Sequence, residues 1–114
     1  MAAATIQLPI ALDAMGGDHA PMSVLKGAEM ALIRHPGIRF LLFGNRYILE
    51  PMLKDIPLLA NAVRIVHTEV VIAGDDKPSL AVRRGRQSSM WLAIESVKEE
   101  QACAVVSAGN TGAL

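Results

Sequence analysis

Four short apolar runs, separated by segments long enough for helices, constrain the fold of this 114-residue chain. The runs are residues 6–12, 38–43, 63–67 and 104–107. Apolar runs of this length are typical of strands buried on both faces, and Pro9 predicts that the first strand starts late. The intervals favour helical crossovers between parallel strands. The pattern therefore predicts a β-α-β-α-β-α-β order and an α/β fold.

Proline, glycine and serine mark the expected helix ends. A helix is predicted between Pro21, which suits a first helical turn, and Pro36, which with the following glycine stops it. Residues 46–54 predict a weaker helix that Pro51 would kink or delay. A further helix is predicted near Ser88, because serine is a favoured N-cap. Its expected core residues are Trp91, Ile94 and Val97.

Composition supports a packed core and excludes several partners. Apolar residues make up 52% of the chain, and 11 basic residues balance 11 acidic ones. No basic excess points to nucleic acid, and neither a secretory signal nor a membrane-length apolar run is present, so a cytoplasmic protein is expected. The fourth run calls for a following helix. Residues 1–114 are therefore expected to be part of one α/β catalytic domain whose remainder is absent.

Glycine-rich turns follow the first and fourth runs. Gly16 and Gly17 follow the first, and Gly109 and Gly112 follow the fourth. If these two strands are neighbours, both turns face one crevice, where helix N-termini favour an anion such as phosphate. Glycine allows close backbone approach. Such turns are often only tight connections, but their pairing favours binding. Asp13 and Asp18 fit less simply, because a carboxylate repels phosphate unless it is paired, protonated or used as a base.

Other polar residues near these turns are candidates for binding or proton transfer. Asn110 and Thr111 offer side-chain donors, and His19 could act as an acid, a base or a donor. Arg83, Arg84, Ser88 and Ser89 could form a second anion site at a helix start. The basic cluster of Arg83, Arg84 and Arg86 could instead be only a solvated helix face.

Nucleotide, metal and cofactor sites have little support in the sequence. Neither turn is a P-loop or a GxGxxG fingerprint. His67-Thr68-Glu69 has the spacing of a deaminase zinc motif but lacks the paired cysteines, so no metal is expected.

Three motifs in order resemble those of the PlsX phosphate acyltransferases. They are IALDAMGGDHAP (residues 10–21), KPS-AVRRG with SSM (within 77–90) and SAGNTGAL (107–114). The resemblance covers nearly the whole chain. It departs from the family at Glu100 and Cys103, which precede the fourth strand and lie away from the expected crevice.

The resemblance implies transfer of a long-chain fatty acyl group from acyl carrier protein to inorganic phosphate. The acyl phosphate product would pass to a membrane glycerol-3-phosphate acyltransferase in bacterial phospholipid synthesis. It also implies a Rossmann-like three-layer α/β/α fold related to phosphotransacetylases and isocitrate-type dehydrogenases, and a homodimer. This chain would be the N-terminal portion, without the segments that associate with the membrane. A coenzyme A-dependent short-chain phosphotransacetylase and a non-catalytic fragment remain alternatives.

Motifs and chemistry together define the expected site. Asp18, His19 and Asn110 are the predicted catalytic residues, with Asp18 or His19 orienting phosphate or moving a proton. The predicted phosphate-binding or substrate-binding residues are Gly16, Gly17, Arg83, Arg84, Ser88, Ser89, Ser107, Gly109, Thr111 and Gly112. Arg83 and Arg84 could instead contact the acidic carrier protein.

Overall fold

A parallel four-stranded sheet forms the centre of the computed structural model, which describes residues 8–69 and 88–107. The elements are β1 (Ile10–Asp13), α1 (Met22–Arg34), β2 (Phe40–Gly44), α2 (Arg46–Lys54), α3 (Pro57–Ala60), β3 (Val63–His67), α5 (Ser89–Lys98) and β4 (Ala104–Val106). The strand order is β3-β2-β1-β4, and every pairing is parallel. This confirms the predicted α/β fold, and the first and fourth strands are neighbours, which is the arrangement on which the expected crevice depends.

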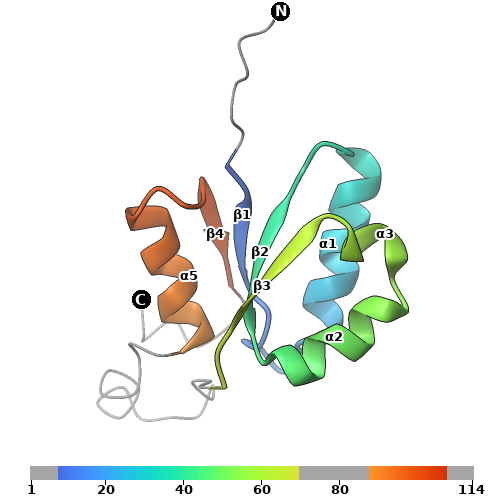
Figure 1. Cartoon of the computed structure of the whole chain (residues 1–114), viewed down its shortest axis with the longest axis horizontal. Coiled ribbons are helices and arrows are strands. Elements are labelled where there is room, and N and C mark those ends of the chain that lie inside the picture. The colour runs from blue at the N-terminus through green and yellow to red at the C-terminus, as the bar shows by residue number, and fades with distance from the viewer. Residues whose placement is uncertain (1–7, 70–87, 108–114) are drawn as a thin grey trace, which may run out of the picture.

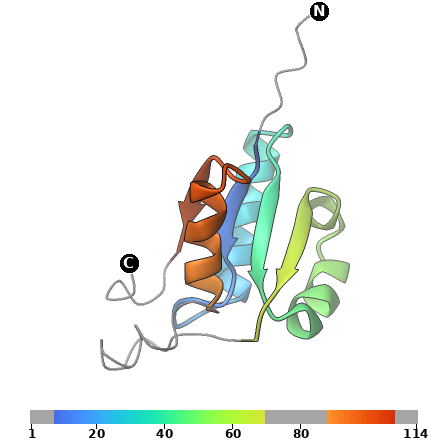
Figure 2. The same cartoon turned by 60° about the vertical axis from the view of Figure 1, so that its left-hand side comes forward.

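Helices cover both faces of the sheet, so the fold has three layers (Figure 1). On one face, Leu12 and Leu42 pack in a cluster with residues of α1, α2 and α3. On the other, Ala11 and Leu41 pack with Ala93 of α5. Neighbouring residues of a strand point to opposite faces, so each strand supplies both clusters. Figure 2 shows the strands edge to edge, with β4 beside β1.

Strand and helix boundaries follow the proline signals only in part. β1 begins at Ile10, directly after Pro9, as expected. The predicted helix over 46–54 is confirmed, and of the two alternatives for Pro51 the late start is excluded, because Arg46 already begins the helix and Pro51 lies inside it. Pro51 is exposed and is the sixth of the nine helical residues, and the N–H that proline lacks would have bonded to the carbonyl of Tyr47 in the first turn. The short α3 was not predicted; its proline stands at the first helical position.

The buried face of α5 differs from the expected one. The helix starts at Ser89 with Ser88 as its N-cap, as predicted. Met90 and Ala93 are its buried apolar residues, whereas Trp91 and Ile94 are only half-buried. Val97 is also half-buried but packs against the core cluster, as expected. Ala93 is fully buried against the sheet, since a small side chain lets the helix axis approach the strands closely.

The N-cap of α2 gives a test of local stability. The Asn45 side chain accepts a hydrogen bond from the Tyr47 N–H at 3.0 Å. Asn45→Ala is expected to lower the free energy of unfolding by about 1 kcal/mol, because that N–H loses its partner. Asn45→Asp keeps the acceptor and should stay within about 0.5 kcal/mol of the parent. Urea denaturation of the two variants measures the difference, and equal losses would contradict the cap.

Candidate functional site

Asp13 lies at the carboxyl end of β1, and its carboxylate joins three segments of the chain. Oδ1 accepts hydrogen bonds from the N–H groups of Met15 at 3.2 Å and Gly16 at 3.0 Å. The Ser89 hydroxyl also donates to Oδ1, and the Ser107 hydroxyl donates to Oδ2 at 2.7 Å. Asp13 is only 2% exposed, so these four donors replace the water that a carboxylate otherwise needs.

The turn after β1 depends on glycine at two points. Gly17 has φ 99°, a conformation that side chains rarely adopt. Gly44, at the end of β2, lies under the Met15 side chain, and a Cβ there would be 2.7 Å from Met15 Cγ. The close approach of β2 therefore holds the turn against the sheet edge.

The start of α5 is built by two consecutive buried serines. Ser88 Oγ accepts the Trp91 N–H at 3.1 Å and so caps the helix. Ser89, only 1% exposed, turns instead toward Asp13. The N-terminus of α5 is thereby fixed beside the ends of β1 and β4, at the edge where open α/β sheets bind ligands.

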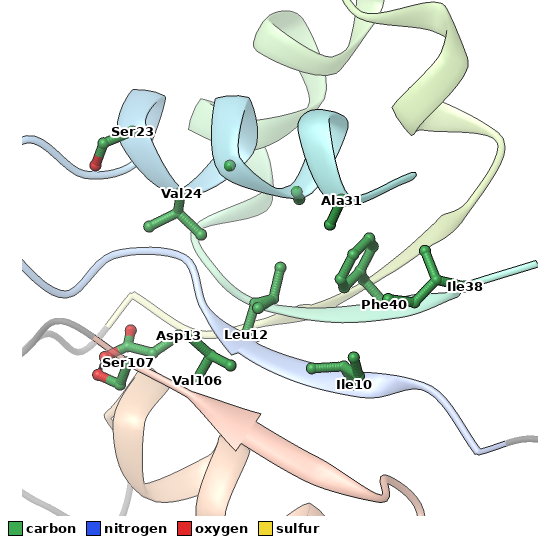
Figure 3. Close-up of a pocket in the computed structure, with 12 residues that line it drawn as sticks. Ile10, Leu12, Asp13, Ser23, Val24, Ala31, Ile38, Phe40, Val106 and Ser107 are labelled. Carbon is green, nitrogen blue, oxygen red and sulfur yellow. Dashed lines mark hydrogen bonds between the residues drawn. The ribbon is translucent and has the colours of Figure 1, made fainter. Parts of the chain in front are cut away.

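An apolar cavity of about 400 Å³ runs along β1 beneath α1. Its walls include Leu12, Val24 and Phe40. Asp13, Ser23 and Ser107 are its polar residues and lie toward one end, with the Asp13 and Ser107 oxygens facing each other (Figure 3). The cavity is thus apolar along its length and polar where it meets the Asp13 cluster.

The structure brings together some of the predicted site residues. Gly16, Ser89 and Ser107 all donate to Asp13. Gly17, Asp18 and His19 are exposed in the turn before α1, and Ser88 is buried at the start of α5. The remaining predicted residues lie outside the described part of the chain: Arg83, Arg84, Gly109, Asn110, Thr111 and Gly112.

The sequence did not predict that Asp13 lies at the centre of this cluster. From the sequence, its carboxylate is expected to repel a bound anion unless it is paired, protonated or used as a base. The available signal was a lone acidic residue that ends a buried strand and directly precedes a glycine turn, where a carboxylate can accept backbone N–H groups. Its serine partners are distant in sequence, so the pattern alone did not indicate them.

His67, which belongs to the sequence that resembles a zinc motif, contacts the start of α2. Its Nδ1 accepts the Arg46 N–H at 3.0 Å, and its ring packs edge-on against Tyr47. Within residues 8–69 and 88–107, His, Cys, Asp and Glu side chains do not gather in threes as a metal site would require. In the same ranges, no helix has the length and apolar character needed to cross a membrane.

The parallel sheet with helices on both faces defines an α/β protein, and the glycine turn and the polar cluster lie at the carboxyl ends of its strands. The model of the family described as "Fatty acid synthesis protein" matches residues 8–114, and the chain belongs to this family. The predicted membership of the PlsX phosphate acyltransferases is thereby confirmed.

Relatives from three bacteria carry the name phosphate acyltransferase. Those of Azorhizobium caulinodans and Xanthobacter autotrophicus are 58% identical to this chain over 106 and 111 residues, or 92% and 96% of its length. That of Parvibaculum lavamentivorans is 55% identical over 108 residues, or 94% of the chain. The aligned parts are only 30%, 31% and 30% of those proteins, which agrees with an N-terminal portion of an acyltransferase.

Proposed function

We propose that the full-length protein containing this chain transfers a long-chain fatty acyl group from acyl carrier protein to inorganic phosphate. A phosphate oxygen would attack the thioester carbonyl carbon, and the carbon–sulfur bond would break. The products are an acyl phosphate and the free thiol of the carrier, which takes the proton of the hydrogen phosphate. The acyl phosphate would then serve a membrane glycerol-3-phosphate acyltransferase in phospholipid synthesis.

The observation that supports this proposal most directly is the meeting of three segments around Asp13. The turn after β1, the start of α5 and the end of β4 converge at the carboxyl edge of the sheet. Backbone N–H groups at such an edge favour phosphate. Phosphate is itself the nucleophile, so the protein needs chiefly to hold two substrates together and to stabilise the oxyanion.

The proposed roles divide between the backbone and the side chains. Because the Gly16 N–H already donates to Asp13, Gly16 contributes through its lack of a Cβ, and the Gly17 N–H is the better phosphate donor. Asp18 or His19, both exposed in the same turn, would orient phosphate or move a proton. Ser88 stays a predicted phosphate ligand, whereas Ser89 and Ser107, whose hydroxyls donate to Asp13, would contribute indirectly. The roles of the residues outside the described ranges stay predictions.

Several properties of the whole protein complete the proposal. We expect a cytoplasmic homodimer that associates peripherally with the membrane through segments absent from this chain. The fold of the complete domain would be related to phosphotransacetylases and isocitrate-type dehydrogenases. Residues 1–114 would form part of one catalytic domain and would be inactive alone, because they supply only one wall of the site.

An acyl-donor comparison tests the function. Purified full-length protein is incubated with phosphate and either palmitoyl-acyl carrier protein or acetyl-coenzyme A, and acyl phosphate is trapped with hydroxylamine as the hydroxamate. We expect palmitoyl hydroxamate that depends on both phosphate and enzyme. A preference for acetyl-coenzyme A would favour a short-chain phosphotransacetylase, and no product from either donor would contradict acyl transfer to phosphate.

A further inference from the structure

We infer that Asp13 is a positioning residue that sets the geometry of the phosphate site without binding phosphate itself. This inference rests on the proposed function, since it concerns the same anion site. Its carboxylate holds the turn after β1, the start of α5 and the end of β4 in one arrangement.

The burial and bonding of Asp13 support this role. The side chain is 2% exposed and accepts from two backbone N–H groups and two hydroxyls. Hydrogen bonds to an ionised carboxylate are stronger than those between neutral groups. Three segments that are far apart along the chain are thus tied to one buried side chain at the end of β1.

The number of hydrogens that each serine hydroxyl can donate shows whether it can bind both Asp13 and phosphate. A serine hydroxyl has one hydrogen to donate, and those of Ser89 and Ser107 go to Asp13. While these bonds persist, neither hydroxyl can donate to a phosphate oxygen. The two serines therefore act through Asp13, and phosphate is bound by other groups on the segments that they anchor.

Removing the charge of Asp13 changes phosphate affinity in opposite directions under the two possible roles of its carboxylate. If the carboxylate only repelled a nearby anion, neutral Asp13→Asn would bind phosphate more tightly. If it positions the three segments, the same variant binds phosphate more weakly. An amide group keeps one acceptor oxygen but replaces the other with an N–H donor, which clashes with a donating hydroxyl.

The experiment uses the full-length protein and measures the KM for phosphate and for the acyl donor separately. We expect Asp13→Asn to raise the phosphate KM about tenfold or more while the acyl-donor KM changes less than about threefold. Ser107→Ala should raise the phosphate KM in the same direction. Ser107→Thr keeps the hydroxyl, so its phosphate KM should stay close to that of the parent. Adding Ser89→Ala to Asp13→Asn should raise the phosphate KM little further, because both substitutions disrupt the same group of hydrogen bonds.

Ser96→Ala is the matched control for loss of a buried serine in α5. Ser96 is 2% exposed and donates to the Ala93 carbonyl at 2.6 Å, so its loss affects stability without touching Asp13. Its phosphate KM should match that of the parent.

Three results would overturn the inference. They are a lower or unchanged phosphate KM in Asp13→Asn, equal increases in both KM values, or fully additive effects of Ser89→Ala and Asp13→Asn. Calorimetric titration with phosphate alone provides a readout without turnover. If the parent binds phosphate but makes no acyl phosphate, the proposed function fails, and weaker phosphate binding by Asp13→Asn and Ser107→Ala still tests the positioning role. If the parent binds no phosphate, the inference fails too.

Discussion

Replacing Asn110 with alanine in the full-length protein is expected to lower the rate of acyl phosphate formation by about 10²–10³ without unfolding the protein. Asn110 lies in the glycine-rich segment that follows β4, the strand paired with β1. Its amide is a suitable donor to a phosphate oxygen or to the oxyanion that develops as the thioester is attacked. Loss of a donor to developing charge affects the transition state most, so kcat should fall.

Asn61→Ala is the control for this prediction. Asn61 is an exposed asparagine after α3, and its side chain donates to the Pro57 carbonyl at 3.2 Å. Its replacement should leave kcat within about twofold of the parent. Single-turnover measurement with saturating phosphate isolates the chemical step, and thermal unfolding shows whether the fold is intact. Near-normal turnover of Asn110→Ala would remove this residue from the catalytic assignment.

Leu42→Ala is expected to cause the largest loss of stability, about 3–5 kcal/mol in the free energy of unfolding. Leu42 is fully buried in the middle of β2, within the cluster formed by α1, α2 and α3. The substitution removes three buried carbon atoms and leaves a cavity that the sheet cannot close, because β1 and β3 fix β2 on both sides.

Leu58→Ala provides the same chemical change at a solvent-exposed position. Leu58 is 51% exposed in α3, so its loss should cost less than about 1 kcal/mol. Denaturant unfolding of both full-length variants gives the comparison. Similar losses in the two would show that Leu42 does not lie in the core described above.

Local signals predicted most of the secondary structure. β3 matches the expected 63–67 run, α2 the expected 46–54 helix, and Ser88 the expected cap of α5. Each depends on neighbours within a few residues, which is the range over which apolar runs, helical spacing and capping act. The face that α5 buries was not predictable in this way. It depends on how closely the helix approaches the sheet, and the small Ala93 at the contact decides that.

The parallel α/β fold followed from the sequence alone, because buried apolar runs joined by helical crossovers have few ways to form a sheet, and the sequence also predicted an anion site at the carboxyl edge. The three motifs likewise indicated the family. Only the tertiary structure decided what Asp13 does. Its hydroxyl partners lie 76 and 94 residues away along the chain, and they meet it only because β4 pairs with β1 and α5 packs on the opposite face from α1. A carboxylate's role depends on the donors that surround it, and those donors come from segments that only the folded crossovers bring together.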